Sequence, residues 1–129
     1  MYMKGSYVVI LEVLQKVDIR VGSLGKIAFN KGYYAYIGSA LNNLEKRIER
    51  HIRKHKKIHW HLDYVLQNRN VKIITVFYKK SVKKKECIIA KSVAQYGKAI
   101  QKFGCSDCKC ESHLFKIMKY DFLKEFKIY

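Results

Sequence analysis

The chain has 129 residues, of which 49% are hydrophobic, and this is enough for one domain with a buried core. No apolar run reaches the roughly 18–20 residues of a membrane span, and the N-terminal segment lacks a small-residue cleavage site after its short apolar run. These features exclude an integral membrane protein. We expect a single domain over residues 1–129 that is soluble and cytoplasmic.

Positive charge dominates the composition. Lysine and arginine number 27 against 10 acidic residues, which gives a formal net charge of +17, and the basic residues are spread over most of the chain after Val13. Such a field attracts polyanions, with an affinity that falls as salt rises. Nucleic acid is therefore the expected partner. The alternative explanation is a lysine-rich surface whose only role is to keep the protein soluble.

The first forty residues favour β-structure. Residues 7–14 are a mostly apolar run, residues 19–21 and 26–29 flank a glycine-containing turn, and residues 33–37 are rich in aromatic side chains. These segments predict an antiparallel meander. Gly38 and Ser39 are expected to end the last strand, and a helix is predicted from about residue 40 or 41 to residue 55, with Leu44, Ile48 and Ile52 on one stripe.

The second half mixes helices and strands. A short helix is predicted over about residues 59–67, a strand over residues 71–78, and a long helix over about residues 85–102 that Gly104 would stop. A last short strand is expected near residues 114–117. Phe122, Leu123 and Phe126 are expected to anchor a terminal helix.

Arg47 and His51 lie four residues apart on the first predicted helix, so both side chains project from the same side. The preceding strand brings tyrosines, including Tyr36, to the start of that helix. A guanidinium, an imidazole and phenol groups suggest a phosphate site, because the planar guanidinium matches phosphate oxygens. The alternative is that the basic residues form a solvated helix edge and that the tyrosines only pack.

Glu86 is the most informative acid. It lies three and seven residues before Ile89 and Val93, which places it on the apolar stripe of the predicted long helix. A divalent cation bridging this carboxylate to a phosphate would satisfy it, since Mg²⁺ commonly takes one or two carboxylates plus water and substrate oxygens. The alternative is a glutamate that stabilises the helix N-terminus or pairs with a lysine.

The C-terminal loop holds four candidate metal ligands within nine residues, and Cys87 lies apart from them in the sequence. A zinc site could use the loop set, namely Cys105, Cys108, Cys110 and His113. A disulfide is the second interpretation, which applies if the organism is a hyperthermophile. Ordinary reduced thiols in a tight loop are the interpretation we favour from the sequence.

His59, His61 and Asp63 resemble a metal-binding pattern only superficially. On a helix His59 and Asp63 would face each other while His61 points elsewhere. We therefore expect this cluster to be a hydrogen-bonded structural element.

Several motifs together carry a resemblance to a known family. The chain contains Gly5-Ser6-Tyr7, then Tyr36-Ile37-Gly38, then an arginine and a histidine one turn apart, and finally a glutamate on a later helix. In this pattern it resembles the GIY-YIG nuclease superfamily. The segments GYYAYIGSAL, HWHLDY and CSDCKCESHLF are similar, more narrowly, to the Uri-like branch of uncharacterised function, whose members also occur fused to DNA glycosylases. The resemblance covers nearly the whole chain.

The resemblance implies an α+β fold with a small antiparallel β-sheet flanked by helices. This chain departs from the family pattern between the two motif halves, where residues 8–35 contain an inserted hairpin in place of a short turn. The resemblance also implies an endonuclease that hydrolyses phosphodiester bonds with Mg²⁺ or Mn²⁺. Tyr7 and Tyr36 match the motif tyrosines, one of which acts as general base or positions the attacking water. Arg47 matches the arginine that stabilises charge on the phosphorane, His51 matches a position held by histidine or tyrosine, and Glu86 matches the metal ligand.

Three further expectations concern His113, the lysines near the tyrosines and the substrate. His113 is an additional candidate active-site residue. Ser39 stands where many relatives have a lysine, so the charge that lowers a tyrosine pKa is expected from Lys26, Lys31 or Lys54. DNA is the expected substrate, with a DNA-repair protein as a further partner. The alternatives are a basic nucleic-acid-binding module with weak or no catalysis and a zinc-stabilised interaction domain.

Overall fold

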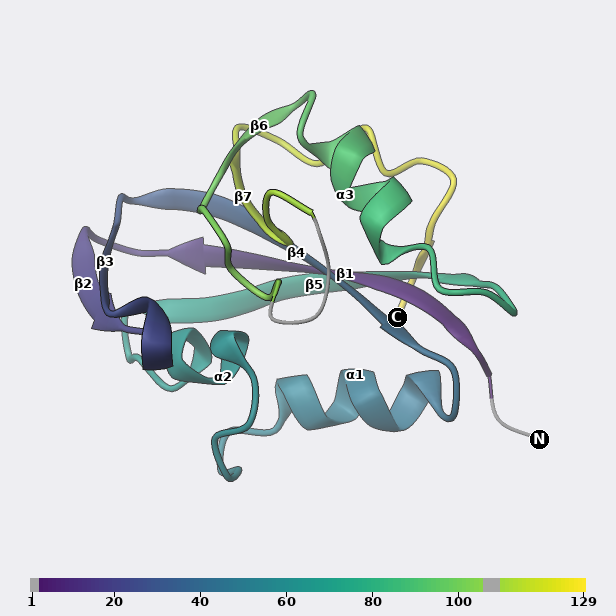
Figure 1. The fold of residues 1–129 in the computed structure, drawn as a ribbon, viewed down its shortest axis with the longest axis horizontal. Coiled ribbons are helices and arrows are strands. Elements are labelled where there is room, and N and C mark those ends of the chain that lie inside the picture. Colours follow the sequence, from purple (N-terminus) through teal and green to yellow (C-terminus); the bar gives the residue numbers. More distant parts are fainter. Residues whose placement is uncertain (1–2, 106–109) are drawn as a thin grey trace.

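The computed structural model describes residues 3–105 and 110–129, so Cys108 lies outside the described residues. The fold is α+β, as predicted, with a six-stranded sheet in the order β6-β7-β4-β1-β5-β8 and a separate two-stranded sheet (Figure 1). The strands of the large sheet are β1 (Gly5–Val13), β4 (Gly32–Ala40), β5 (Val71–Lys80), β6 (Gly97–Ala99), β7 (Leu114–Ile117) and β8 (Lys127–Ile128).

The central strand β1 pairs antiparallel with β4 on one side and with β5 on the other. All nine residues of β1 but one are buried, because both faces of the sheet are covered. Alternate side chains enter two separate cores. Tyr7, Val9 and Leu11 point into one core, and Val8 and Ile10 point into the other.

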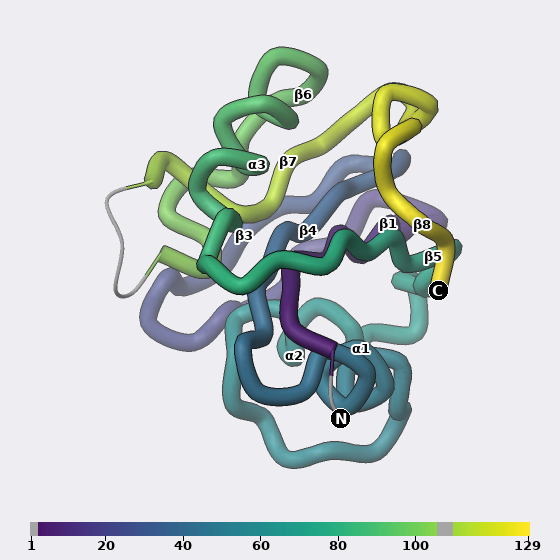
Figure 2. The backbone as a smooth tube through the Cα atoms, turned by 90° about the vertical axis from the view of Figure 1, so that its right-hand side faces the viewer, coloured from purple at the N-terminus to yellow at the C-terminus, as the bar shows by residue number. Residues whose placement is uncertain are grey.

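Helices cover both faces of the large sheet. The helices α1 (Leu44–Ile52) and α2 (His61–Leu66) lie on one face, and α3 (Glu86–Val93) lies on the opposite face (Figures 1 and 2). Leu44 and Ile48 of α1 and Leu62 and Val65 of α2 join the first core, whereas the α3 side of the sheet holds the second. None of the helices in the described part of the chain is long and apolar enough to cross a membrane.

The strands β2 (Val17–Arg20) and β3 (Lys26–Phe29) form the inserted hairpin. A short 3-10 helix, η1 (Gly22–Leu24), makes its turn, and Gly22 has φ +47°, a conformation that favours glycine. The predicted hairpin is therefore confirmed, but it forms a sheet of its own, so the strands of the first forty residues do not make one antiparallel meander. Ile19 and Phe29 attach it to the first core.

The strand β4 continues through Gly38 and Ser39 to Ala40, so the prediction that this pair ends the strand is wrong. The helix α1 begins at Leu44 rather than near residue 41, because the side chain of Asn43 caps it by accepting from the amide of Lys46 at 3.0 Å. It ends at Ile52. The predicted short helix is confirmed as α2, and the predicted strands near residues 71–78 and 114–117 are confirmed as β5 and β7.

Two predicted helices differ from the structure. The long helix ends at Val93, and the following residues form β6, which pairs with β7. Gly97 lies so close to the backbone of Lys116 that a β-carbon there would overlap with it. This close pairing between distant segments replaces the last turns of the predicted helix. The terminal helix is also absent from the described residues, where β8 instead pairs with β5 (Figure 2).

Candidate functional site

A cavity of about 370 Å³ opens beside the second half of β4. The neighbouring strand β7 pairs with β4 only as far as Tyr36, and the amide of Ile37 then donates to the carbonyl of His113 at 2.9 Å. Beyond this point no strand among the described residues pairs with that edge of β4, and residues from both faces of the sheet line the cavity. Five of the six candidate residues from the sequence line it, namely Tyr7, Tyr36, Arg47, Glu86 and His113.

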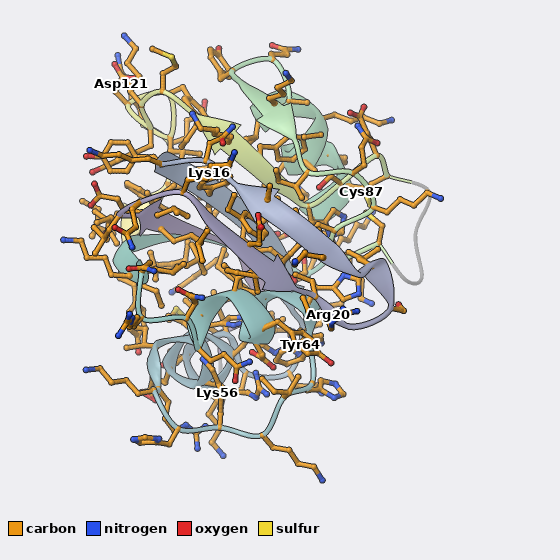
Figure 3. The ribbon with its side chains drawn as sticks, turned by 90° about the vertical axis from the view of Figure 1, so that its left-hand side faces the viewer. Lys16, Arg20, Lys56, Tyr64, Cys87 and Asp121 are labelled. Atoms are coloured by element: carbon orange, nitrogen blue, oxygen red, sulfur yellow. A yellow bond between two sulfur atoms is a disulfide. The ribbon has the colours of Figure 1, made fainter. Side chains whose placement is uncertain are left out.

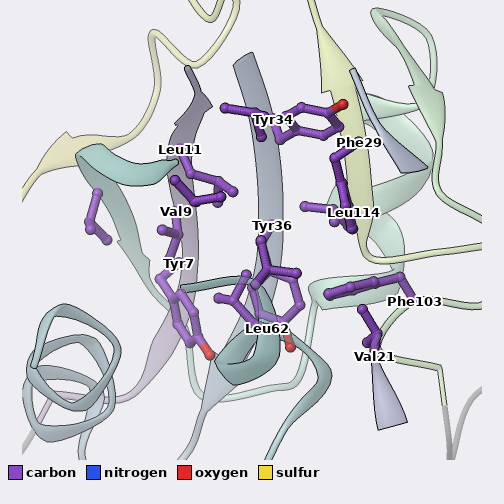
Figure 4. Close-up of a cluster of buried hydrophobic side chains, with 14 of the residues drawn as sticks. Tyr7, Val9, Leu11, Val21, Phe29, Tyr34, Tyr36, Leu62, Phe103 and Leu114 are labelled. Carbon is purple, nitrogen blue, oxygen red and sulfur yellow. The ribbon is translucent and has the colours of Figure 1, made fainter. Parts of the chain in front are cut away.

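The pairing of β1 and β4 explains why the two tyrosines and the motif glycine occur together. Tyr7 lies directly opposite Gly38, and Tyr36 lies opposite Val9, so both tyrosines are on the same face of the sheet. A β-carbon on Gly38 would overlap with the ring and hydroxyl of Tyr7. Glycine therefore leaves room for the phenol. Figure 4 shows both tyrosine hydroxyls pointing toward the same end of the core.

His51 does not line the cavity but lies behind it, fully buried. Its Nε2 atom is 2.8 Å from the hydroxyl oxygen of Tyr7. The guanidinium of Arg47 also hydrogen-bonds to Tyr7, and a guanidinium can only donate. The Tyr7 oxygen thus accepts from Arg47 and shares one proton with Nε2 of His51, and the tautomer of His51 sets which of the two atoms donates.

Burial controls the ionisation of this pair. It lowers the pKa of His51 from 6.5 to about 3, with help from the positive charge of Lys56, so the imidazole is neutral at pH 7. Burial also raises the pKa of Tyr7 to about 12, although the charge and hydrogen bond of Arg47 act in the opposite direction. Tyr7 is therefore a neutral phenol whose oxygen faces the cavity.

Tyr36 is equally enclosed. Its ring makes edge contacts with Phe103 and His51, at centroid distances of 6.1 and 6.0 Å. Burial, followed by the nearness of Tyr7, raises the pKa of the Tyr36 phenol. Both motif tyrosines hence carry their protons at neutral pH.

Arg47 is held at the mouth of the cavity by two contacts. Its Nη1 donates to the carbonyl of Ser39 at 3.1 Å, and its guanidinium lies 4.5 Å from the centre of the Trp60 ring. The same ring contacts the guanidinium of Arg50 at 4.4 Å. These contacts fix the direction of the Arg47 side chain and leave further donors for a ligand.

The segment around Asp63 supports Trp60, as the sequence predicted for a hydrogen-bonded structural element. Asp63 is fully buried and accepts from the amides of His59 and Trp60 at 2.8 and 3.0 Å. Arg50 donates to both carboxylate oxygens, at 3.1 and 2.9 Å. Burial alone would raise the pKa of Asp63, but the hydrogen bonds from Arg50 and these amides outweigh it and lower the pKa.

Glu86 is the first residue of α3, and its side chain lines the cavity. Its Oε2 atom is buried and has no hydrogen-bond partner among the described residues. A buried carboxylate oxygen without a partner is costly, and a divalent cation is the kind of ligand that satisfies it. Glu86 therefore fits the role of a Mg²⁺ ligand on the chemistry of its surroundings.

The cavity is also lined by residues that the sequence analysis did not identify as functional. They are Lys84, two residues before Glu86, and the aromatic and imidazole side chains His59, Trp60 and His61. Lys26, Lys31 and Lys54 are not among the lining residues, so their expected role beside the tyrosines is not supported. Arg47 and Arg50 supply the positive charge that acts on Tyr7.

The structure contains a disulfide, which was the second of the three interpretations of the cysteines. Cys87 and Cys110 form a disulfide, although the sequence separates them by 23 residues. The favoured prediction of reduced thiols is wrong for this pair. Cys87 lies far from the loop ligands in the sequence, but in the structure its sulfur is 3.8 Å from Nε2 of His113. Figure 3 shows Cys87 and Lys56 on opposite sides of the large sheet.

A second, shallower cavity of about 770 Å³ lies on the outer side of α1. Arg47 lines both cavities, so the two are neighbours. The second cavity is lined mainly by basic and amide side chains, including Asn42, Lys46 and Arg53. This composition favours an anionic ligand that continues from the first cavity.

Comparison with known proteins gives one result. A family model described as "Domain of unknown function DUF123" matches residues 6–128. Neither the search of curated proteins nor the search of solved structures gave a match. The matched range includes every residue that lines the two cavities.

Proposed function

This chain belongs to the DUF123 family, and we propose that it is a divalent-metal-dependent endonuclease that hydrolyses phosphodiester bonds, as in the GIY-YIG superfamily that its motifs resemble. The observation that carries this proposal is the meeting of Tyr7, Arg47 and Glu86 in one cavity, from three elements far apart in the sequence. Displacement at phosphorus needs an acceptor for the attacking water, a fixed cation and a carboxylate that holds a metal. Tyr7, Arg47 and Glu86 would supply these groups in that order.

In this proposal Tyr7 positions the attacking water. We assign the proton of the neutral His51 ring to Nδ1, so that Nε2 accepts from the Tyr7 hydroxyl and an oxygen lone pair of Tyr7 is left to accept from a water in the cavity. With a pKa of about 12, the phenol is a poor source of phenolate at pH 7. Its role is therefore orientation of the water in the resting state, with any proton uptake coupled to the arrival of the substrate and its cation.

Arg47 and Glu86 have complementary roles. Arg47 places a planar set of donors at the cavity mouth, where it would bind the non-bridging oxygens that gain negative charge in the transition state. Glu86 would hold Mg²⁺ or Mn²⁺ through its buried Oε2. The cation, when bound, would neutralise charge on the phosphate and on the leaving oxygen.

The proposed substrate is nucleic acid, with DNA as the first candidate and a role in DNA repair or processing. The charge of +17 supports a polyanionic partner, and the second cavity offers exposed cations beside Arg47 for a flanking phosphate. Phosphate contacts of this kind position a backbone without reading its sequence. We therefore expect recognition of DNA structure more than of a base sequence.

The test is cleavage of plasmid DNA and of a branched DNA junction by the purified protein with Mg²⁺, Mn²⁺ or EDTA. Cleavage with either cation and none with EDTA is expected. The Tyr7→Phe and Arg47→Ala variants should lose at least about tenfold in rate, because each removes one group from the cavity. Equal rates for wild type and both variants would contradict the proposed site.

A second candidate function is nucleic-acid binding without turnover. The observation that favours it is the pKa of both motif tyrosines, which burial raises. This candidate predicts salt-dependent DNA binding and intact DNA after long incubation with Mn²⁺. The cleavage assay therefore separates the two functions directly.

A further inference from the structure

Three potential metal ligands from two distant segments meet beside the cavity. The sulfur atoms of Cys87 and Cys110 and a ring nitrogen of His113 all lie within 4.8 Å of one another. Cys87 is the second residue of α3, whereas Cys110 and His113 come from the segment that leads into β7. The α-carbons of the two cysteines are 6.1 Å apart.

The donor types and their spacing suit Zn²⁺. Thiolate and imidazole are the ligands that zinc prefers, in contrast to the oxygen of Glu86, which suits Mg²⁺. With Zn–S bonds of about 2.3 Å, neighbouring ligand atoms of a tetrahedral site lie about 3.5–3.8 Å apart. Sγ of Cys87 and Nε2 of His113 are 3.8 Å apart, which is the distance expected between two ligand atoms of such a site. All three ligand atoms lie within 4.8 Å of one another, so only small movements of these side chains would be needed to bind the metal.

We propose that the reduced protein binds one Zn²⁺ through Cys87, Cys110 and His113, and that the Cys87–Cys110 disulfide is the oxidised, metal-free form of the same site. The fourth position would be filled by water. The site differs from the set suggested by the sequence because it requires Cys87. It does not depend on the proposed nuclease function.

The two forms interconvert by balanced chemistry. A phosphine reductant takes the oxygen of one water and delivers two electrons and two protons to the sulfurs, so the S–S bond breaks and two thiols form. Zn²⁺ then displaces the two thiol protons as it binds the sulfurs. Metal and disulfide exclude each other, because the same two sulfur atoms are used in both.

Zinc binding would also affect the neighbouring cavity. Glu86 immediately precedes Cys87, and His113 lines the cavity itself. A metal ion bound to Cys87, Cys110 and His113 would connect the first turn of α3 to the segment before β7. It would thereby fix the backbone that carries the Glu86 carboxylate.

The experiment measures metal binding by the full chain after reduction with a phosphine, which unlike a dithiol competes little for zinc. Titration with Co²⁺ should give a thiolate-to-cobalt charge-transfer band with a stoichiometry of about one, and Zn²⁺ should displace the cobalt. Zinc content is measured in parallel on oxidised protein with its disulfide intact, where no stoichiometric zinc is expected. Absence of the cobalt band in reduced wild type, or full zinc occupancy with the disulfide intact, would overturn the proposal.

Variants identify the ligands. Cys87→Ser and Cys110→Ser should each weaken Zn²⁺ binding by at least tenfold, and so should His113→Ala, while His55→Ala, which removes an exposed histidine elsewhere, should bind as wild type. Thermal melting of each variant checks its folding, and the wild-type cobalt spectrum stands whether or not one variant folds. Undiminished zinc binding by folded Cys87→Ser would place any site in the loop alone and contradict the proposal.

Discussion

The hydroxyl of Tyr7 lies 2.8 Å from Nε2 of His51, across 44 residues of sequence. This hydrogen bond joins the central strand to the last turn of α1, and both side chains are buried. His51 can accept the Tyr7 proton only while its ring is neutral at Nε2. The state of one buried histidine therefore decides how the Tyr7 phenol is presented to the cavity.

The first prediction concerns stability at acid pH. The pKa of His51 is lowered from 6.5 to about 3 in the folded protein, so between these values the unfolded chain binds a proton that the folded chain does not. The free energy of unfolding must fall as the pH falls through this window. Between pH 7 and pH 5 the loss from this group is about 2 kcal/mol.

Replacing the imidazole tests this assignment. His51→Gln keeps a hydrogen-bonding side chain without a titrating ring, so the stability difference between pH 7 and pH 5 should shrink by about 2 kcal/mol. Urea unfolding at both pH values gives this difference. His55→Gln controls for removing an exposed histidine, and an unchanged pH dependence in His51→Gln would show that His51 is not the group concerned.

The second prediction concerns the glycine opposite Tyr7. A β-carbon in Gly38→Ala would overlap with the Tyr7 ring, so the phenol must move and its bond to His51 must lengthen or break. We expect a loss of about 1–3 kcal/mol in stability from this overpacking. In a Tyr7→Leu background the same substitution should cost clearly less, and additive costs in this double-mutant cycle would contradict the direct contact.

Local patterns were sufficient for the parts of the fold that short-range sequence determines. The strands around Tyr7, Tyr36 and Val76 were predicted because β-branched and aromatic residues cluster there. The end of α3 was missed for a different reason. Ile89, Val93, Tyr96 and Ile100 keep helical spacing, but Gly97 pairs closely with Lys116 in the sheet, and sequence spacing contains no information on that long-range partner.

In the candidate site, too, the features set by short-range sequence were predicted and those set by long-range packing were not. Tyr7, Tyr36, Arg47 and Glu86 were identified as candidates from motif and spacing, and the structure brings them to one cavity. A disulfide was one interpretation of the cysteines, but the pairing of Cys87 with Cys110 was missed, since it depends on how α3 packs against the segment before β7. Trp60 was also missed as a support for Arg47, because its position follows from the buried Arg50–Asp63 pair.

The third prediction concerns that pair. Asp63 is fully buried and holds Arg50 and two backbone amides, so Asp63→Ala leaves several donors without a partner. We expect a loss of about 3 kcal/mol in the free energy of unfolding. The exposed pair of Asp121 with Lys119 at 3.9 Å is the control, and Asp121→Ala should change stability by less than about 0.5 kcal/mol. Similar costs for both variants in chemical denaturation would contradict this difference in burial.

The fourth prediction concerns the second cavity. Lys46 and Arg53 are exposed cations there, so Lys46→Ala and Arg53→Ala should weaken DNA binding and reduce the slope of log K against log salt by about 1 each. Fluorescence anisotropy over a salt series measures both quantities. Lys119→Ala removes an exposed charge near Asp121 and should retain the wild-type slope. Equal effects of all three variants would indicate a diffuse charge effect in place of a defined phosphate position.

The single-turnover rate of DNA cleavage by Glu86→Gln with saturating Mn²⁺ tests whether Glu86 holds the catalytic metal. The variant keeps the size of the side chain and removes the charge whose buried oxygen would hold the metal. We expect the rate to fall at least about a hundredfold relative to wild type, while Glu125→Gln, at an exposed ion pair with Lys79, retains the wild-type rate. A wild-type rate for Glu86→Gln, or loss of cleavage equally in both variants, would contradict this role of Glu86.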